Sequence, residues 1–396
     1  MSSEAVIVAG ARTAVGTAFR GTLLDVDAME LATKTVSETV RRSGLDPEVF
    51  DDVVLGESLY GGGALARYAA IEAGLPGVAG LAHNRHCASG LATLQTAASS
   101  IMAGMDRVVI AGGVQSSSTM PRTDRRVPGT DEWEEDWLAP SHRETPDAPI
   151  RDMTITVGWN AAVKAGISRE DMDAWAFRSH QRAIAGIDSG SFHEEIFALD
   201  VTRRDGTTTV FEVDEHPRRG STLEKLASLK PLHPEIEGFS ITAGNSAGVN
   251  DGAAAVVVAE RSVAEQHGLE PLAVVRSWAS VGVPPADTGL APAAAITRAL
   301  DRAGITPGYV DLWEINEAFA SVPIAAVRAL GIDDEIVNVL GSGCSLGHPV
   351  AMTGTRMVLT LIHELRRRGG GTAVAAMCAG GGMASAVVLD VPTPQK

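Results

Sequence analysis

Apolar and polar positions divide the start of the chain into segments of two kinds. Residues 5–13, AVIVAGART, form a continuous apolar run that ends in glycine and polar residues, which is typical of a strand covered on both faces of a sheet. Over residues 29–40 the apolar side chains recur instead at helical spacing, and Asp27 and Gly44 are placed to cap and to end this helix. Residues 46–57 then predict a turn and a second strand. The order strand, helix, strand indicates an α/β fold.

The same pattern returns later in the chain. Residues 42–57, RSGLDPEVFDDVVLGE, align without a gap with residues 302–317, RAGITPGYVDLWEINE, at an offset of 302 − 42 = 260. At this offset Cys87 falls on Gly347, one residue before His348, and both halves continue as helix, strand and glycine cluster. Chance similarity in a chain rich in alanine and glycine is the alternative explanation. Otherwise the chain contains a duplicated α/β unit.

The middle of the chain, from about residue 115 to residue 247, has no counterpart in the second half. It is rich in Pro, Asp and Glu at first, and it then predicts a helix that begins with a capping box of Ser168 and Asp171. We interpret it as an inserted loop domain that covers the active site. The expected division is an N-terminal half of residues 1–116 completed by 248–270, a loop domain of 117–247, and a C-terminal half of 271–396.

The formal net charge of −16 argues against two classes of partner. Nucleic acids and anionic membrane surfaces would both be repelled by the average field, so we expect neither. No apolar run is long enough to cross a bilayer. The first residues lack the basic and apolar segments of an export signal, so the expected location is cytoplasmic.

Three cysteines are candidates for chemistry rather than for disulfides. Their number is low and odd, and none has metal-ligand spacing to another, so we expect no metal site. Cys87 precedes a predicted helix, where a helix N-terminus or a neighbouring histidine lowers the pKa of a thiol and favours the nucleophilic thiolate. A packing role is the alternative for Cys87, and it is the expected role of Cys344.

Two further segments have the features of a reactive site. His348 precedes Pro349, and we expect this proline to be the first residue of a helix whose positive end lies at His348. Cys378 lies just before three consecutive glycines, whose backbone N–H groups would be open to an oxyanion, although a tight hairpin is the alternative. The segment NEAFA, residues 316–320, follows a strand, where its Asn and Glu could also serve only as a cap.

Together these motifs make the chain similar to the thiolase family over nearly its whole length. Five motifs occur in the family's order: NRHCASG (84–90), TAGNSAGVNDGAAA (242–255), EINEAFA (314–320), GHP (347–349) and CAGGG (378–382). The resemblance implies two similar α/β halves in a layered αβαβα arrangement with an inserted loop domain. It also implies acyl-CoA substrates, a homodimer or homotetramer, and a place in fatty acid metabolism.

The resemblance assigns a role to each residue of the site. It implies that Cys87 is the nucleophile that takes an acyl group from coenzyme A, and that His348 is its base. Cys378 resembles the acid/base that moves the α-proton. Asn316 would hold a water beside His348 in one oxyanion hole, and the N–H groups of Cys87 and Gly380 would form the other. The implied reaction is reversible Claisen condensation of two acyl-CoA thioesters, or thiolytic cleavage of a 3-oxoacyl-CoA.

Contacts with coenzyme A, a substrate and product rather than a resident cofactor, are expected at two places. The basic segment 215–230 would meet its phosphates, although a solvated charged surface is the alternative. The expected contact residues are Arg218, Arg219, Lys225, Ser246, Ala247 and Met153. The acidic residues 131–136 would repel the coenzyme and are expected on an outer or subunit-facing surface.

Some positions depart from the family pattern near the substrate. Met153 and Thr154 stand where many members have His and Met, Ala247 replaces a serine, and Ala351 replaces a glycine. The acyl specificity is therefore open. A condensing enzyme that uses a carrier protein and an inactive scaffold are the alternatives. The two cysteines, the histidine and the triple glycine favour coenzyme A chemistry over both.

Overall fold

Two similar sets of strands make up the main sheet. In the computed structural model, which describes residues 3–58 and 65–394, the N-terminal set is β1 (Ala5–Arg12), β3 (Asp52–Gly56), β4 (Ala79–His83), β5 (Val108–Gln115) and β10 (Asn250–Glu260), with the short β2 (Gly16–Thr17) on β10. The C-terminal set is β11 (Ala273–Gly282), β12 (Leu312–Ile315), β13 (Gly371–Ala379) and β14 (Met383–Val391). The strand order is β12-β13-β14-β11-β1-β10-β5-β3-β4.

The strand order and directions repeat between the two sets. From the junction outward the sets run β1, β10, β5, β3 and β11, β14, β13, β12. The pairs β3 with β5 and β12 with β13 are parallel, and the pairs nearer the junction are antiparallel. Strand β4 extends the N-terminal set beyond β3 and is also parallel to it. Among the described strands, the two sets are joined by the pairing of β1 with β11, where Val6 pairs with Val274 and Ile7 with Ala273. This correspondence confirms the duplication that the sequence predicts.

The aligned repeat segments have the same local structure. Residues 42–57 contain the end of α1 (Ala28–Ser43), a 3₁₀ turn at Pro47–Val49 and β3. Residues 302–317 contain the end of α8 (Ala291–Ala303), a 3₁₀ turn at Pro307–Tyr309 and β12. The predicted caps of α1 are also confirmed, because the Asp27 side chain accepts from the Glu30 N–H and Gly44 adopts a left-handed φ of 64°.

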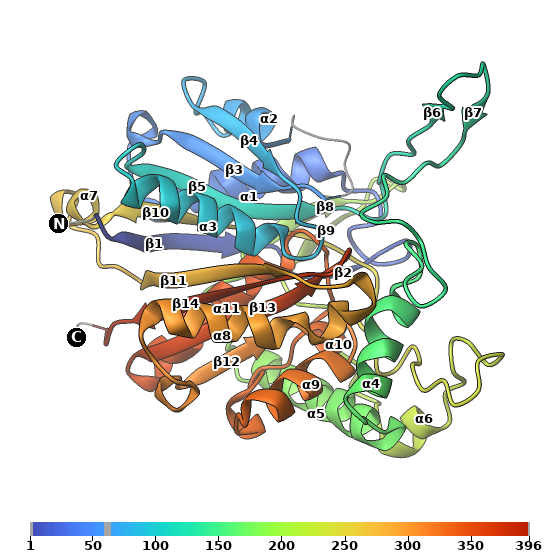
Figure 1. The fold of residues 1–396 in the computed structure, drawn as a ribbon. Helices are drawn as coiled ribbons and strands as arrows, with labels where there is room; N and C mark the ends of the chain where they lie inside the picture. The colour runs from blue at the N-terminus through green and yellow to red at the C-terminus, as the bar shows by residue number, and fades with distance from the viewer. Residues whose placement is uncertain (1–2, 59–64, 395–396) are drawn as a thin grey trace.

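Helices cover the strands in layers (Figure 1). Helices α3 (Ser89–Met102) and α11 (Thr353–Arg368) contact each other and strands of both sets, so they form the central layer. Their apolar side chains share one buried cluster, which includes Leu91, Ile101 and Leu361. Helices α1 and α2 (Leu65–Glu72) pack outside the N-terminal set, and α8 packs outside the C-terminal set. The expected αβαβα arrangement is confirmed.

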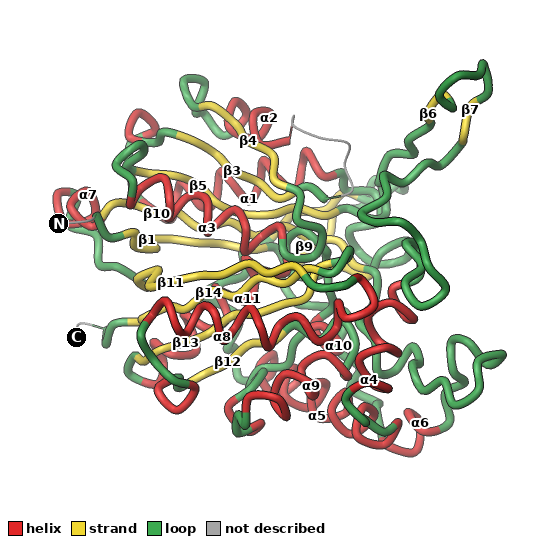
Figure 2. Tube along the Cα trace, in the orientation of Figure 1, coloured by secondary structure: helices red, strands yellow, loops and turns green. Residues whose placement is uncertain are grey.

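The chain between β5 and β10 forms most of the irregular structure, which gathers at one end of the sheet (Figure 2). Its main helix, α5 (Arg169–Asp188), begins with the predicted capping box of Ser168 and Asp171. The other elements are the hairpins β6 (Arg125–Arg126) with β7 (Trp133–Glu134) and β8 (Leu199–Thr202) with β9 (Thr208–Phe211), a π-helix at Thr154–Trp159, α4 (Asn160–Lys164) and α6 (Leu223–Ala227). The remaining short helices are α7 (Arg261–Gln266), α9 (Ser321–Leu330), α10 (Gly343–Leu346) and 3₁₀ turns at Pro285–Leu290 and Asp334–Ile336.

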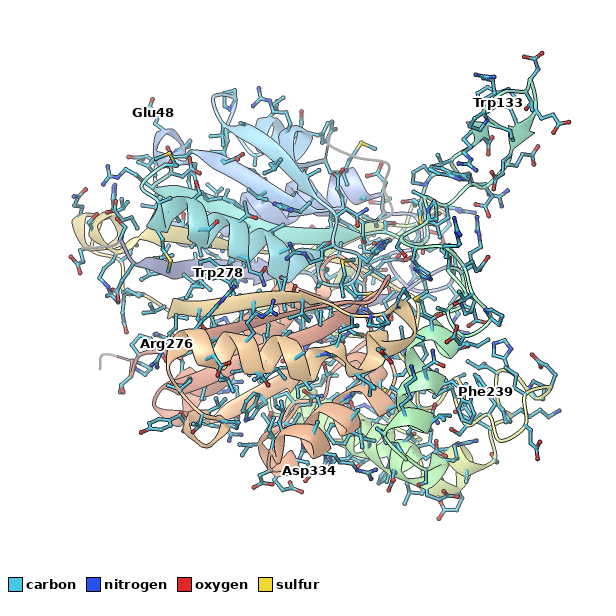
Figure 3. The ribbon with its side chains drawn as sticks, in the orientation of Figure 1. Glu48, Trp133, Phe239, Arg276, Trp278 and Asp334 are labelled. Atoms are coloured by element: carbon cyan, nitrogen blue, oxygen red, sulfur yellow. The ribbon has the colours of Figure 1, made fainter. Side chains whose placement is uncertain are left out.

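The β6–β7 hairpin projects away from the body of the molecule (Figure 1). Trp133 lies on this hairpin with 64% of its surface exposed (Figure 3), and all of residues 131–136 are exposed. The acidic run is therefore on an outer surface, as expected. No helix among residues 3–58 and 65–394 is long and apolar enough to cross a membrane.

Candidate active site

A rigid turn places Cys87 two residues ahead of α3. Asn84 Oδ1 accepts from the His86 N–H at 3.0 Å, and Ser89 Oγ donates to the His86 carbonyl at 2.7 Å. These bonds hold His86 at a φ of 46°, in the left-handed region that few non-glycine residues adopt. Such backbone strain commonly marks a functional turn. The prediction that Cys87 lies at a helix start is confirmed.

His348 lies in a turn that precedes α11 rather than at its first residue. Helix α11 begins at Thr353, so the expectation that Pro349 opens the helix is wrong. The Pro349 carbonyl accepts from the N–H groups of Met352 and Thr353, and these bonds close a separate turn between His348 and the helix.

The backbone of Gly347 lies against the side chain of Asn250, and this contact fixes where the turn begins. Gly347 adopts a φ of 95°, and a Cβ there would lie 2.6 Å from Asn250 Cγ, so only glycine fits. Asn250 Oδ1 accepts from the His348 N–H at 3.0 Å. Asn250 Nδ2 donates to the Gly16 carbonyl at 3.0 Å, which ties the turn to the N-terminal half. Asn250 therefore orients the backbone of His348.

The same turn packs against the beginning of α3. A Cβ at Gly90 would lie 2.8 Å from the Ala351 carbonyl oxygen, and a Cβ at Gly113 would overlap that oxygen. Because Gly90 is only three residues after Cys87, these close contacts hold the His348 turn next to the cysteine turn. The pairing of these two turns across the halves agrees with the prediction from the repeat.

Thr353 sets which ring nitrogen of His348 carries the proton. Its Oγ1 donates to the Pro349 carbonyl at 2.7 Å, so its single hydrogen is already used. The contact of 2.6 Å between Oγ1 and His348 Nδ1 therefore has Nδ1–H as the donor. The lone pair of Nε2 is left for a proton or a hydrogen bond, and Asn316 Nδ2 lies 3.4 Å from it.

We expect the substitution Thr353→Val to slow acylation of the enzyme by about tenfold to a hundredfold, part of the 10²–10⁴ that a general base commonly supplies. Valine keeps the volume but cannot accept from Nδ1–H, so the ring loses its tautomer and its orientation. Rapid-quench measurement of thioester formation from acetyl-CoA would give the rate. The substitution Thr353→Ser keeps the hydroxyl, so this variant is expected to retain most of the wild-type acylation rate. Equal rates for wild type and Thr353→Val would contradict this assignment.

Burial keeps His348 neutral. Removal from water, together with the charge of Arg356, lowers the pKa of His348 to about 3. Arg356 is itself buried and forms an ion pair with Glu314, whose pKa burial raises to about 7 against the opposing effect of that arginine. The imidazole is therefore a free base at physiological pH.

Asn316 follows β12 and is fully buried. Its N–H donates to the Ala376 carbonyl of β13 at 2.9 Å, which fixes its backbone beside the strand that carries Cys378. Its Oδ1 is buried and has no hydrogen-bond partner among the residues that the structure describes. The side chain therefore has an acceptor that can serve a bound group.

Cys87, Cys378 and Gly380 come together at the end of β13. Burial raises the pKa of the Cys87 thiol, while hydrogen bonds from the N–H groups of Gly380 and of Cys87 itself partly offset this. Burial and the neighbouring Cys87 raise the pKa of Cys378 far above its ordinary value. The prediction that a helix start lowers the pKa of Cys87 is wrong in net effect, because desolvation exceeds the stabilisation by two N–H donors.

The other predicted contact residues lie in two groups. A Cβ on Gly380 would lie 3.7 Å from Met153 Sδ, so Met153 lies beside Gly380. Ser246 and Ala247 instead line the NEAFA segment, because Ala247 N–H donates to the Ala318 carbonyl at 3.0 Å and Ser246 pairs with Phe319.

The three basic candidates are exposed on the loop region. Arg219 pairs with Asp188 at 2.5 Å, and Lys225 Nζ donates to the Gly220 carbonyl at 2.6 Å. Arg218 donates its backbone N–H to His180 Nδ1 at 3.2 Å, and its side chain has no partner among the described residues. Two residues earlier, His216 Nδ1 lies 2.9 Å from the Ser345 carbonyl, just before the His348 turn.

Cys344 is buried. Its Sγ contacts the Glu317 carbonyl at 3.6 Å, and burial with the Glu317 charge raises the pKa of its thiol well above the ordinary value. In the described part of the chain no group of His, Cys, Asp and Glu residues could hold a metal ion.

Sequence reasoning missed three supporting residues. Thr353 and Arg356 lie on the first turn of α11, and neither position has a signal of its own in a single sequence. Asn250 lies in the motif of residues 242–255, where a buried polar residue in an apolar strand was the available signal. All three act on His348 rather than on the thiols.

Comparison with known proteins places the chain among the thiolases. The model of the thiolase N-terminal domain matches residues 5–262, and that of the thiolase C-terminal domain matches residues 269–391. An acetyl-CoA acetyltransferase of Pseudomonas aeruginosa is 41% identical, with 98% of this chain and 99% of that protein covered. A 3-ketoacyl-CoA thiolase of Bacillus subtilis is 39% identical, again with 98% and 99% covered.

Solved structures show the same likeness. The acetyl-CoA acetyltransferase of Bacillus anthracis has a TM-score of 0.90 at 38% identity, with 98% of this chain and 99% of that chain covered. The human mitochondrial 3-ketoacyl-CoA thiolase in complex with CoA has a TM-score of 0.88 at 33% identity, with 99% and 98% covered. The chain therefore belongs to the thiolase family of acyltransferases.

Proposed function

We propose that this enzyme cleaves or forms 3-oxoacyl-CoA thioesters through an acyl group carried on Cys87. The observation that carries the proposal is the shared site of Cys87 and Cys378, in which the N–H groups of Gly380 and Cys87 both point at the Cys87 sulfur. Claisen chemistry needs one group to hold the acyl and another to move the α-proton. Two thiols with different surroundings supply both functions.

The first half of cleavage begins with His348. Its neutral Nε2 takes the proton of Cys87, and the thiolate attacks the C3 carbonyl of the substrate. The resulting Nε2–H and a water bound by Asn316 can then donate to the oxygen that develops negative charge at the leaving thioester enolate. The N–H groups of Cys87 and Gly380 stabilise the tetrahedral oxyanion on C3. One ring nitrogen thus serves first as base and then as donor.

The second half uses Cys378. Its raised pKa keeps this thiol protonated in the free enzyme, so it can give a proton to the α-carbon as the C2–C3 bond breaks and acetyl-CoA leaves. The Cys378 thiolate then takes the proton of an incoming coenzyme A. That coenzyme attacks the thioester on Cys87, and the shortened acyl-CoA and the free thiolate result. Condensation is the reverse sequence.

Thiolysis of a panel of 3-oxoacyl-CoA esters with coenzyme A tests this proposal directly. Cleavage of at least one ester into acetyl-CoA and a shortened acyl-CoA is expected. A carrier-protein condensing enzyme would act on acyl carrier protein thioesters and not on the coenzyme A esters. A scaffold would cleave neither. The Cys87, Cys378 and His348 set favours the thiolase reaction over both alternatives.

The coenzyme is expected to reach the site along the loop region, with its phosphates near Arg218, Arg219 and Lys225. Support comes from the exposed, unpaired side chain of Arg218 and from the bond between His216 and Ser345 that ties this segment to the site. Residues Met153, Ser246 and Ala247 would contact its pantetheine and acyl parts. Residues 117–247 would thus act as the loop domain proposed from the sequence.

Replacing Arg218 and Arg219 together by alanine is expected to raise KM for the acyl-CoA about tenfold with little change in kcat, because phosphate contacts bind substrate and transition state alike. The increase should shrink at moderate salt, where the Debye length is about 8 Å. The pair Glu134→Ala with Glu135→Ala on the β6–β7 hairpin is the matched control. A changed KM in the control pair and an unchanged KM in the arginine pair would overturn this placement.

We further propose a homodimer or homotetramer. Among the described strands, β4 lies at the edge of the sheet with β3 as its one partner, and an unpaired edge is a template for a second chain. Leu81 of β4 is 43% exposed beside the exposed Tyr68 and Ile71 of α2. Sedimentation velocity measures the state, and a monomer at micromolar concentration would contradict the proposal. A cytoplasmic location and a role in fatty acid metabolism complete the proposed function.

A further inference from the structure

His233 bridges two carboxylates that come from different parts of the loop region. Its Nε2 lies 2.7 Å from Asp152 Oδ2, and its Nδ1 lies 2.8 Å from Glu235 Oε1. A neutral imidazole has one N–H donor and an ionised carboxylate can only accept, so both contacts are hydrogen bonds only when the ring is an imidazolium. The bridge is therefore complete only while His233 carries a positive charge.

Asp152 connects this bridge to the π-helix at Thr154–Trp159. While its Oδ2 faces His233, its Oδ1 accepts from the Thr154 N–H at 3.0 Å and from the Thr154 hydroxyl at 2.5 Å. The residue between these two bonded residues is Met153, whose Sδ lies beside Gly380. The bridge thus acts on the turn that carries Met153. Short π-helical segments are frequent at functional sites.

The loop that carries His233 also packs on the π-helix. The His233 ring meets the Phe239 ring edge-on with 4.9 Å between centroids, and the Phe239 ring lies 5.1 Å from that of Trp159. Phe239 is buried, so this contact is part of the packed interior of the loop region. The chain then enters the motif of residues 242–255, which holds two of the expected coenzyme contacts. One loop therefore connects the Met153 turn with the second group of expected contacts.

The charge on His233 is favoured by its two partners. The hydrogen bond to Glu235, together with the charge of Asp152, raises the pKa of His233 above its ordinary value, although desolvation opposes this. Among the described residues these are the charged groups that act on the ring, one from its own loop and one from the start of the π-helix. The bridge is therefore complete below the ordinary pKa of about 6.5 and is lost as the pH rises through the raised pKa.

We propose that His233 is a positioning residue for the substrate, and that its bridge to Asp152 holds the Met153 turn beside Gly380. The inference rests on the proposed function, in which Met153 contacts the substrate. Without the bridge, the loop and the start of the π-helix can separate, and substrate binding then has to order them again. Because the reacting thiols and their base lie on other elements, loss of the bridge is expected to raise KM and to leave kcat nearly unchanged.

The test measures kcat and KM for thiolysis of 3-oxohexanoyl-CoA between about pH 6 and about pH 9, a range that spans the ordinary pKa of histidine. His233→Phe keeps a ring against Phe239 but removes both donors, so its KM should be about threefold to tenfold above that of wild type near the acidic end. This ratio should fall towards one as the wild-type ring loses its proton. His233→Arg keeps a permanent cation with several donors, so its KM should stay low at the alkaline end, where that of wild type rises.

Two further substitutions isolate the bridge. Asp152→Asn removes the negative charge but can still accept from Thr154, and it should raise KM as His233→Phe does. The double variant should be no worse than either single variant, because both changes remove the same contact. His267→Phe changes an exposed histidine that follows α7, and it is the matched control that should keep wild-type values at every pH.

The outcomes distinguish this role from the reaction itself. Equal KM values for wild type and His233→Phe across the pH range would overturn the role of His233 while the thiolase reaction stands. A His233→Arg variant that behaves like His233→Phe, or a loss confined to kcat, would overturn it as well. Absence of thiolysis in wild type with the whole panel of esters would instead contradict the proposed function, and this inference with it.

Discussion

Alanine in place of Cys87 is expected to lower kcat/KM for thiolysis by about 10⁴-fold or more, as in enzymes that lose their covalent nucleophile. No other thiol can replace it, because Cys378 is held protonated by burial and Cys344 lies against the Glu317 carbonyl. Initial rates with a 3-oxoacyl-CoA and coenzyme A give the value. The variant should remain folded, since the change removes a single sulfur from a half-buried position.

Cys344→Ala is the matched control for this variant. It removes a buried thiol from the same chain, and its N–H bond to Glu317 is made by the backbone and is retained. Its rate should stay within about threefold of wild type, as for a small change outside the reacting groups. A Cys87→Ala enzyme with more than a tenth of the wild-type activity would exclude Cys87 as the acyl carrier.

Cys378→Ala is expected to separate the two half-reactions. The variant keeps the Cys87 thiol, the neutral His348 and both N–H donors, so acyl transfer from acetyl-CoA to Cys87 should still occur, slowed because the departing coenzyme A loses its proton donor. Exchange of the α-protons of acetyl-CoA with deuterium should fall by about 10³–10⁴-fold, the upper range for loss of a general acid/base. Nuclear magnetic resonance of acetyl-CoA in D₂O measures the exchange. Normal exchange in the variant would assign the proton transfer to another residue.

Much of the fold could be predicted because its signals are local or repeated. Asp27 and Gly44 mark the ends of α1, and the aligned segments 42–57 and 302–317 predict matching helix, turn and strand units. The structure confirms both, and the repeat also predicts that the Cys87 and His348 turns are neighbours. Their approach depends on the packing of Ala351 against glycines of the other half, which agrees with that prediction.

The parts that could not be predicted depend on tertiary contacts. Pro349 suggested a helix start, yet the bonds to its carbonyl close an additional turn before Thr353. The helix start before Cys87 suggested a lowered pKa, yet burial among elements of both halves outweighs it. The tautomer of His348 is set by a hydroxyl that only the folded turn brings within 2.6 Å. The local sequence indicates which secondary structure a segment favours, but it does not show how far tertiary packing removes a side chain from water.

Family membership alone does not define the acyl group of the substrate, because this depends on the residues around the thiols. The side chains of Met153 and His86 flank Gly380, so a thioether and an imidazole lie beside this residue. Membership of the thiolase family indicates the class of reaction, and the acyl preference depends on the side chains around the thiols.

Mass spectrometry of the protein after brief incubation with acetyl-CoA tests the central claim most directly. The account predicts one added acetyl group in wild type, located by peptide mapping on Cys87, and the same adduct in Cys378→Ala. The adduct should be absent from Cys87→Ala. An acetyl group mapped to Cys378 or Cys344 in wild type, or an adduct that persists in Cys87→Ala, would contradict it.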